Sequence, residues 1–292
     1  MKLTIIIPSF NEAENLESLL SSLKQFVTSK EYEVILVNDA STDDSLTILE
    51  QKNKGNWFRL ISNKVNRGYG GSIKEGIKVA KGEYVITIDA DGQHNIDDIE
   101  KLYNYILENN ADMIIGSRDD SSSSLIRQIG KSAIRKIVKI LMPITIHDIN
   151  SGMKLYNTKL ARTYIKQCPD TMAYSDIITL FFIYKKHLVI ETPIGINKRL
   201  KGKSTISYKT AINTVFEIIN IVMLFNPLKI FLPIAIFSIS CGLIWGSQFV
   251  LLGKGVSVGA LLAIIIGVLL AFLALMSESL SKLRMAMLKD SD

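Results

Sequence analysis

The stretch from 84 to 94 reads Tyr84-Val85-Ile86-Thr87-Ile88-Asp89-Ala90-Asp91-Gly92-Gln93-His94. The run up to Ile88 predicts a short buried strand, and Asp89 and Asp91 follow at its end. Two carboxylates spaced i and i+2 at a strand end can face one hard cation in the following turn. Oxygen ligands of this kind favour Mg²⁺ or Mn²⁺. Acidic turns are common, so the meaning of this pair depends on the fold around it.

Short apolar runs alternate with helical patterns on both sides of this stretch. The Ile- and Val-rich runs of strand length cover residues 3–8, 33–38, 58–62, 84–89 and 112–116. Helical periodicity covers residues 12–27, 43–53, 70–81 and 96–110. Asn11 is a start signal for the first of these helices. The repeated strand–helix order predicts an α/β fold with a mostly parallel, doubly wound sheet.

Polar residues follow four of the predicted strands. In sheets of this type, ligands bind in the crevice beyond the carboxyl ends of the strands. We therefore expect the four polar ends to converge on one crevice. They are Ser9-Phe10-Asn11-Glu12, Asn38-Asp39, Asp89-Ala90-Asp91 and Gly116-Ser117-Arg118.

Composition narrows the class of protein. The chain has 292 residues, of which 48% are hydrophobic, and a net charge of +6. No dense Lys/Arg run with interleaved aromatic residues is present, which argues against nucleic acid as a partner. Cys168 and Cys241 lie far apart, which excludes a disulfide scaffold and a cysteine zinc site. The first apolar run is too short for the core of a signal peptide, so we expect the N-terminal domain in the cytoplasm.

A basic helical pattern follows the polar segment 119–124. Arg127, Lys131 and Arg135 are spaced i, i+4 and i+8, so they share one helix face. That face is either simply solvated or directed at a phosphate or an anionic membrane.

Two uncharged runs near the C-terminus, about 230–252 and 256–276, are each long enough to cross a bilayer. Only Gly253-Lys254-Gly255 separates them, which predicts a tight transmembrane hairpin. Basic residues flank both outer ends, so the positive-inside rule predicts a multi-pass protein of the cell membrane with both termini cytoplasmic.

The stretch 208–228 is interpreted as an interfacial amphipathic helix. Four glycines would allow these helices to pack closely, either within one chain or between chains. The sequence therefore leaves a homo-oligomer open. The four glycines are Gly242, Gly246, Gly259 and Gly267.

Several segments together resemble family 2 glycosyltransferases. The general motifs are Ile6-Ile7-Pro8-Ser9-Phe10-Asn11-Glu12-Ala13-Glu14-Asn15-Leu16, Val37-Asn38-Asp39-Ala40-Ser41-Thr42-Asp43, Asn66-Arg67-Gly68-Tyr69-Gly70 and Asp89-Ala90-Asp91-Gly92-Gln93-His94. Three more segments resemble the dolichyl-phosphate mannose synthase and polyprenyl-phosphate glucosyltransferase branch. They are Gly116-Ser117-Arg118, Asp148-Ile149-Asn150-Ser151-Gly152-Met153-Lys154 and Arg199-Leu200-Lys201-Gly202-Lys203-Ser204. The chain departs from the family pattern at three places. Asn38 stands where a second Asp is common, and Asn95-Ile96 replaces a usual pair with Pro. Thr205 stands where a Lys is often found, which leaves Lys203 as the nearby cation.

This resemblance implies a GT-A type fold, with a mostly parallel sheet and flanking helices, followed by the interfacial helix and the hairpin. It implies a cytoplasmic glycosyltransferase domain over 1–207, a linker over 208–228 and the hairpin with a cytoplasmic tail over 229–292.

The resemblance also implies roles for single residues. Those expected to bind the nucleotide of the donor are Pro8, Phe10, Glu12, Asp39, Asn66 and Ala90. Those expected to hold Mg²⁺ or Mn²⁺ on its diphosphate are Asp89, Asp91 and Gln93. Those expected to meet the acceptor phosphate are Arg118, Arg127, Lys131, Arg199 and Lys203. Asp148 and Ser151-Gly152 are expected to shape the sugar side. Asp176 lies near where many sugar transferases place a catalytic acid, and it acts either as a base or in positioning.

The sequence thus favours an inverting, metal-dependent transfer of a sugar from a nucleotide diphosphate sugar to a polyprenyl phosphate at the cytoplasmic face of the membrane. UDP-glucose is the favoured donor, with GDP-mannose as the other choice. Two alternatives stay open at this stage. One is transfer to a sugar hydroxyl in polysaccharide synthesis, and the other is a catalytically silent membrane adaptor that binds a nucleotide sugar.

Overall fold

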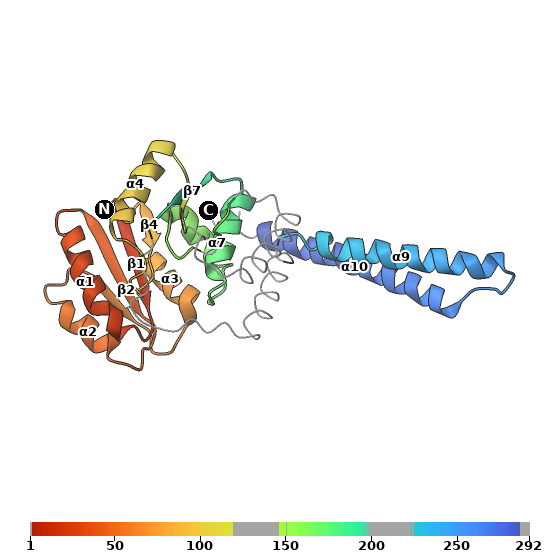
Figure 1. Ribbon diagram of the computed structural model, residues 1–292, viewed down its shortest axis with the longest axis horizontal. Coiled ribbons are helices and arrows are strands. Elements are labelled where there is room, and N and C mark those ends of the chain that lie inside the picture. Colours follow the sequence, from red (N-terminus) through yellow and green to blue (C-terminus); the bar gives the residue numbers. More distant parts are fainter. Residues whose placement is uncertain are drawn as a thin grey trace. The chain divides into compact units, whose positions relative to one another are not determined.

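The computed structural model describes residues 2–118, 146–149, 151–195, 197, 223 and 225–286. These residues form two compact units (Figure 1). The first, within residues 2–197, is the sheet domain. The second, within residues 223–286, is the hairpin.

The described part of the sheet domain is built on seven strands in the order β3-β2-β1-β4-β6-β5-β7. All neighbouring strands run parallel except β6, which pairs antiparallel with both β4 and β5. The chain moves outward from β1 to β2 and β3, and then crosses to β4 on the other side of β1. The strand order therefore reverses between β1 and β4, which is where open α/β sheets bind ligands. The strands are β1 Leu3–Ser9, β2 Tyr32–Asn38, β3 Arg59–Ser62, β4 Tyr84–Thr87, β5 Met113–Ser117, β6 Lys154–Asn157 and β7 Val189–Pro193.

Helices cover both faces of this sheet. They are α1 Ala13–Val27, α2 Ser45–Lys52, α3 Gly68–Val79, α4 Asp97–Asn109, α6 Thr158–Tyr164 and α7 Tyr174–Tyr184. Successive side chains of a strand point to opposite faces. Ile5 and Ile7 of β1 accordingly join the buried core that α1 and α4 complete, whereas Ile6 faces Gly76 of α3. Figure 1 shows α1 and α3 on opposite sides of the strands.

The five predicted strands and four predicted helices of residues 3–116 are all present, which confirms the doubly wound, mostly parallel sheet. The start signal at Asn11 is wrong in detail. Asn11 has a left-handed backbone with φ 54°, and its side chain accepts the Thr42 N–H at 2.8 Å. Helix α1 begins at Ala13, whose N–H is bound instead by the Asp43 carboxylate at 3.1 Å. The cap therefore comes from the segment before α2, which local sequence cannot indicate.

The hairpin consists of α9, Leu228–Leu251, and α10, Val258–Ala286. Both helices are long and apolar enough to cross a membrane, and only a small share of each is buried. Apolar side chains such as Phe237 and Leu251 are exposed at 70% and 85%. A helix of a soluble core would bury these side chains, so their exposure indicates a lipid-facing surface. Helix α10 continues ten residues beyond the predicted end at Met276, and its last turns carry an ion pair between Glu278 and Lys282.

The two helices of the hairpin pack through glycine. A Cβ atom at Gly242 would lie 2.8 Å from the Ala260 carbonyl oxygen, and one at Gly267 would lie 2.8 Å from that of Ala235. These positions on α9 and α10 let the two backbones approach closely. The small residues noted in the sequence therefore pack helices within one chain, and self-association stays a prediction.

Candidate active site

The loop between β3 and α3 is held in place by Asp39, which follows β2. Its buried carboxylate accepts hydrogen bonds from the backbone N–H groups of Arg67 and Gly68, each at 2.8 Å, and from the Asn63 side chain at 2.8 Å. Both carboxylate oxygens are therefore used to fix the start of α3. In the structure, Asp39 therefore stabilises the loop that carries Asn66. The expected contact of Asp39 with a nucleotide stays a prediction.

Helix α3 connects this loop to the acidic turn after β4. Tyr69, the residue after Gly68, donates its hydroxyl to Asp89 Oδ1 at 3.0 Å. His94 Nε2 lies 3.2 Å from the other oxygen, Oδ2. A continuous chain of contacts therefore runs from Asp39, after β2, through Gly68 and Tyr69 to Asp89 and His94, after β4. The polar residues that follow β2 and β4, which the sequence predicts in one crevice, are thus linked by hydrogen bonds through the start of α3.

The Asp89 carboxylate is kept ionised by this surrounding. Burial raises its pKa, but the hydrogen bonds from His94 and Tyr69 and the charge of Arg118 outweigh burial and hold the pKa below its ordinary value. Burial and the neighbouring Asp89 raise the pKa of Tyr69 well above its ordinary value, so the phenol stays protonated and donates. The result is a fixed anion at the switch point of the sheet.

Gly152 is required by this arrangement. A Cβ atom at this position would lie 2.2 Å from Asp89 Oδ2. The segment that returns to β6 can therefore pass the carboxylate only if residue 152 has no side chain. The expected role of Gly152 in shaping the sugar side is untested, but its contact is with the acidic turn.

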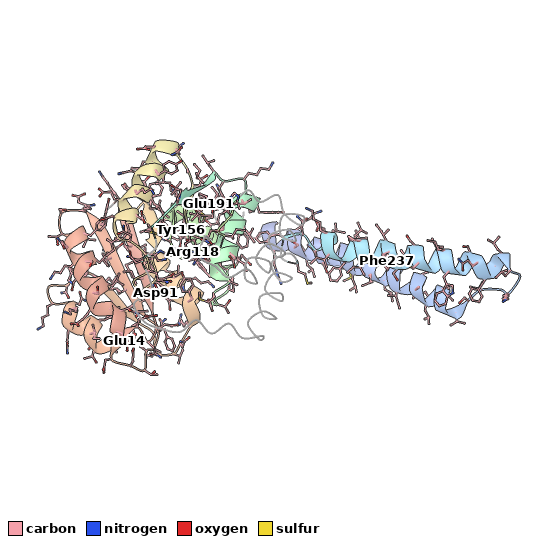
Figure 2. The ribbon with its side chains drawn as sticks, in the orientation of Figure 1. Glu14, Asp91, Arg118, Tyr156, Glu191 and Phe237 are labelled. Carbon is pink, nitrogen blue, oxygen red and sulfur yellow. The ribbon has the colours of Figure 1, made fainter. Side chains whose placement is uncertain are left out.

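Asp91 lies on the same turn in a more open position. It is half-buried, and its Oδ1 accepts the Gln93 N–H at 3.1 Å across Gly92, which has φ 73°. This Asx-type turn directs the chain toward His94. Figure 2 labels Asp91 and Arg118 in the sheet domain.

Arg118 follows β5 and is joined to Asp148 by a two-pronged ion pair. Its Nε and Nη2 atoms lie 2.8 and 3.0 Å from the two oxygens of Asp148, and its backbone N–H donates to Oδ2 at 3.1 Å. Burial raises the pKa of Asp148, but the hydrogen bonds and charge of Arg118 outweigh it and lower the pKa. The backbone N–H of Asp148 is bound in turn by Glu191 of β7 at 2.7 Å. Asp148 therefore orients Arg118, and the charge of Arg118 also acts on Asp89.

Lys154 of β6 is a site residue that the sequence reasoning missed. Its side chain is fully buried, and its ammonium donates to Ser175 Oγ at 2.7 Å, to Thr179 Oγ1 at 2.9 Å and to the backbone carbonyls of Ile149 and Ser175. Burial lowers its pKa to about 8, against the opposing influence of Asp176 and Asp148. One buried cation thus ties the segment of Asp148 to the start of α7, where Asp176 lies. A lysine between the apolar residues Met153 and Leu155 was the available signal.

The remaining predicted residues divide into two groups. Of the expected nucleotide contacts, Pro8 and Ala90 are buried, Glu12 is half-buried, and Phe10 and Asn66 are exposed. Four expected phosphate contacts lie outside the described residues, as does most of the predicted interfacial helix. They are Arg127, Lys131, Arg199 and Lys203.

The donor set of the acidic turn fits a hard divalent cation. Among the residues that the structure describes, no three His, Cys, Asp or Glu side chains form a complete metal cluster. Mg²⁺, however, is usually held by only one or two carboxylates together with substrate phosphates. The ionised Asp89, the half-buried Asp91 and the amide oxygen of Gln93 supply oxygen donors of that kind.

The sequence of this domain matches the family model described as "Glycosyl transferase family 2" over residues 4–165. The chain belongs to glycosyl transferase family 2. It is thus a glycosyltransferase, as its motifs predicted. A second model, described as "GtrB C-terminal hairpin", matches residues 226–283, which contain nearly all of α9 and α10.

Two relatives align with this family 2 glycosyltransferase over three quarters of its length. It is 26% identical to a dolichyl-phosphate beta-glucosyltransferase from Dictyostelium discoideum, covering 75% of this chain and 73% of the relative. It is 28% identical to an undecaprenyl-phosphate 4-deoxy-4-formamido-L-arabinose transferase from Photorhabdus laumondii, covering 75% and 67%. Both names specify a polyprenyl phosphate.

Solved structures confirm the GT-A type fold. Glucosyl-3-phosphoglycerate synthase from Mycobacterium tuberculosis, solved with Mn²⁺, UDP-glucose and phosphoglyceric acid, superposes with a TM-score of 0.58 at 14% identity, over 76% of this chain and 79% of that chain. TarS 1–349 from S. aureus, solved with UDP, gives a TM-score of 0.53 at 20% identity, over 76% and 64%. At these identities the likeness concerns the fold alone.

Proposed function

We propose that this family 2 glycosyltransferase moves a sugar, with inversion, from a nucleotide diphosphate sugar to a polyprenyl phosphate at the membrane surface. The observation that carries the proposal is that Asp89 is ionised under the influence of Arg118, in a chain that also holds a hairpin of two helices long and apolar enough to cross a membrane. UDP-glucose is the favoured donor, and GDP-mannose is the second choice.

On the donor side, Asp89, Asp91 and Gln93 would hold Mg²⁺ or Mn²⁺. When bound, such an ion neutralises negative charge that develops on a diphosphate leaving group. Tyr69 and His94 fix Asp89, and Asp39 fixes the loop that leads to Tyr69. Pro8, Phe10, Glu12, Asn66 and Ala90, which lie at or after the carboxyl ends of β1, β3 and β4, would contact the nucleotide.

On the acceptor side, Arg118 would bind the phosphate, together with Arg127, Lys131, Arg199 and Lys203. Guanidinium groups suit this task because their forked N–H donors match phosphate oxygens. A phosphate monoester has its second pKa near about 6, so its oxygens are already nucleophilic at neutral pH. The reaction then needs no residue to remove a proton from the acceptor. Asp176 is accordingly assigned to positioning of the sugar and the site, rather than to general-base catalysis.

The hairpin would bring the site to its lipid substrate. Lys229 lies in the first turn of α9, while Lys282 and Arg284 lie in the last turns of α10. These basic ends belong to the same side of a hairpin, so the positive-inside rule assigns them to the cytoplasm. We propose a cytoplasmic catalytic domain over 1–207, a linker over 208–228 and a membrane hairpin with a cytoplasmic tail over 229–292. The names of both relatives support the lipid acceptor.

A donor panel tests this proposal. Membranes containing the protein are supplied with undecaprenyl phosphate and, in separate reactions, UDP-glucose, GDP-mannose and an N-acetylated UDP-sugar, and the lipids are analysed by mass. The proposal expects a polyprenyl-phosphate hexose with one donor and its loss in EDTA. Incorporation of sugar only into polysaccharide would instead support a hydroxyl acceptor. Binding of donor without any transfer would support the silent adaptor.

A further inference from the structure

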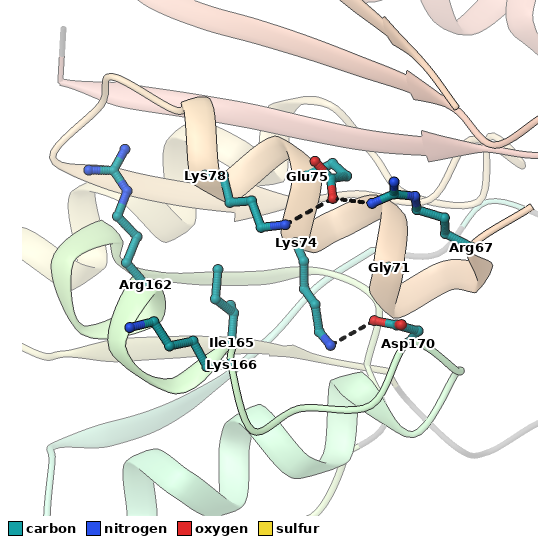
Figure 3. Close-up of a pocket in the computed structure, with 9 residues that line it drawn as sticks. All are labelled: Arg67, Gly71, Lys74, Glu75, Lys78, Arg162, Ile165, Lys166 and Asp170. Atoms are coloured by element: carbon teal, nitrogen blue, oxygen red, sulfur yellow. Dashed lines mark hydrogen bonds and ion pairs between the residues drawn. The ribbon is translucent and has the colours of Figure 1, made fainter. Parts of the chain in front are cut away.

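A charged cavity lies on the sheet domain, and no residue of the acidic turn lines it. It has a volume of ≈ 550 Å³ and is bounded by α3 on one side and by α6 with the segment that follows it on the other (Figure 3). Five cationic side chains line it, whereas only two carboxylates, Glu75 and Asp170, do so. The cations are Arg67, Lys74, Lys78, Arg162 and Lys166.

The cavity uses a different face of α3 from the candidate active site. Positions 67, 71, 74 and 78 follow helical spacing and form one stripe along α3, and this stripe lines the cavity. Tyr69 lies off that stripe and contacts Asp89 instead. The same helix therefore presents one face to each site.

The two carboxylates do not neutralise the cavity. Glu75 Oε1 is shared by Arg67 at 2.6 Å and Lys78 at 2.9 Å. Asp170 is paired with Lys74 at 2.7 Å. Each carboxylate carries a single charge, so the five cations retain a clear positive excess.

The two remaining cations come from α6 and its C-terminal extension. Arg162 is anchored on α3, where it donates to the carbonyls of Ile77 at 3.2 Å and Ala80 at 2.5 Å. These contacts hold the guanidinium at the wall of the cavity and use neutral acceptors, so its charge is not cancelled. Lys166 lies one turn further along and is exposed. Figure 3 shows Arg162 and Lys166 across the cavity from Lys78.

We propose that this cavity binds a phosphate-bearing anion, separate from the donor and acceptor of the transfer reaction. Concentrated positive charge in a concave, partly desolvated surface attracts anions, and arginine and lysine together are the usual phosphate ligands. The volume suits a ligand with more than one phosphate or with a phosphate attached to a larger group. The source of the phosphate is either a soluble compound or the headgroup of an anionic lipid.

Binding of inorganic pyrophosphate to the full-length protein in detergent, measured by calorimetry in EDTA, tests the site. The Lys78→Gln/Lys166→Gln variant should bind at least about tenfold more weakly than the wild type. The matched control is Lys24→Gln/Lys54→Gln, which removes the same charge from exposed positions elsewhere on the domain and should bind normally. Asp91→Asn should also bind normally, because the site is separate from the acidic turn.

Protein reconstituted in nanodiscs distinguishes the two phosphate sources. Equal pyrophosphate binding in phosphatidylcholine and phosphatidylglycerol discs, with sensitivity to the cavity variant in both, identifies a soluble anion. Binding only in phosphatidylcholine discs identifies a lipid headgroup that already fills the cavity in the anionic discs. The proposal is wrong if pyrophosphate does not bind in either, if both lysine variants lose binding equally, or if Asp91→Asn abolishes binding.

Discussion

Arg118 and Asp148 are joined by two side-chain hydrogen bonds of 2.8 and 3.0 Å, and this pair connects the end of β5 to the segment that returns toward β6. The same guanidinium lowers the pKa of Asp89. Arg118 is therefore oriented by one anion and acts electrostatically on a second, which would hold the donor's cation. An acceptor phosphate bound there would meet a cation whose geometry is already fixed.

Removing the charge of Asp148 should therefore impair catalysis more than folding. Asp148→Asn keeps the size of the side chain but presents an amide N–H₂ to the guanidinium, so the two-pronged pair is lost. We expect kcat/KM for the lipid acceptor to fall about ten- to a hundredfold, or about 1.4 to 2.7 kcal/mol. Donor binding should change little. Steady-state kinetics with each substrate varied separately measures both effects.

The control for this variant is Asp112→Asn, at the opposite end of β5. Asp112 also accepts a backbone hydrogen bond, from Leu188 at 2.9 Å, so its loss should lower stability without a selective effect on the acceptor. An equal fall of donor and acceptor affinity in Asp148→Asn would show that Arg118 is not an acceptor residue.

Asp91→Asn tests the proposed cation site. The change removes one carboxylate charge while the amide oxygen can still accept the Gln93 N–H, so the turn should persist. Turnover at saturating Mg²⁺ should fall at least about a hundredfold, because the charge that balances the cation on the diphosphate is lost. Asp97→Asn, an exposed carboxylate at the start of α4, is the matched control and should retain activity. Near-normal turnover of Asp91→Asn would remove this residue from the metal site.

Gly152→Ala tests the contact between the β6 segment and the acidic turn. The added methyl group would overlap Asp89 Oδ2, which Tyr69 and His94 hold in place, so either the carboxylate or the backbone must move. We expect severe loss of turnover and weaker Mn²⁺ binding in titrations of the purified protein. Gly195→Ala places a Cβ at an ordinary 3.6 Å from Asp98 Oδ2 and should be active. Unchanged Mn²⁺ binding by Gly152→Ala would argue against Asp89 as a ligand.

The buried Lys154 predicts opposite pH dependences of activity and stability. Its folded-state pKa of about 8 lies below the value of about 10.4 expected in an unfolded chain. Between these two pH values the unfolded state binds more protons, so the contribution of Lys154 to stability increases as pH rises. Turnover should decrease over the same range, because the neutral amine holds the segments of Asp148 and Asp176 less firmly. Besides these two carboxylates, Arg118 and Cys168 also influence this group.

This prediction is checked by comparing pH–rate and pH–stability profiles of the wild type and two variants. Lys154→Arg keeps its charge throughout, so a folded variant should lose the alkaline fall in turnover near pH 8. Lys154→Met should lose the contribution of Lys154 alone, so the unfolding free energy of the wild type should rise relative to that of this variant between pH 8 and 10. Identical alkaline limbs in the wild type and Lys154→Arg would contradict the positioning role.

The sequence allowed the central sheet to be predicted because its parallel strands are buried on both faces. Runs such as Ile5-Ile6-Ile7 have no polar alternation, and their lengths distinguish them from helices. The acidic turn could be placed for the same reason, since it directly follows such a run. β6 was missed because it is four residues long, contains a lysine and pairs antiparallel with strands distant in sequence.

The finer geometry of the site was beyond local reasoning. The sequence predicts a nucleotide contact for Asp39, but its carboxylate oxygens accept hydrogen bonds from the backbone N–H groups of Arg67 and Gly68. Arg67 lies 28 residues further along the chain, so the local sequence around Asp39 does not indicate this contact. Lys154 belongs to one of the predicted motifs, but the sequence does not indicate that its ammonium is buried. The oxygens that accept its hydrogen bonds come from α7 and from Ile149. Long-range hydrogen bonds of this kind depend on the tertiary arrangement rather than on periodicity or spacing.

The identity of the acceptor is tested most directly by offering the purified, reconstituted protein undecaprenyl phosphate and undecaprenol side by side, with the same sugar donor and Mg²⁺. The two lipids share the chain that the hairpin would approach and differ only in the phosphate. Mass analysis of the products should find a glycosylated lipid phosphate from the first and no product from the second. Glycosylation of undecaprenol at a comparable rate would contradict the account, since it would mean that a hydroxyl, and not a phosphate, is the acceptor.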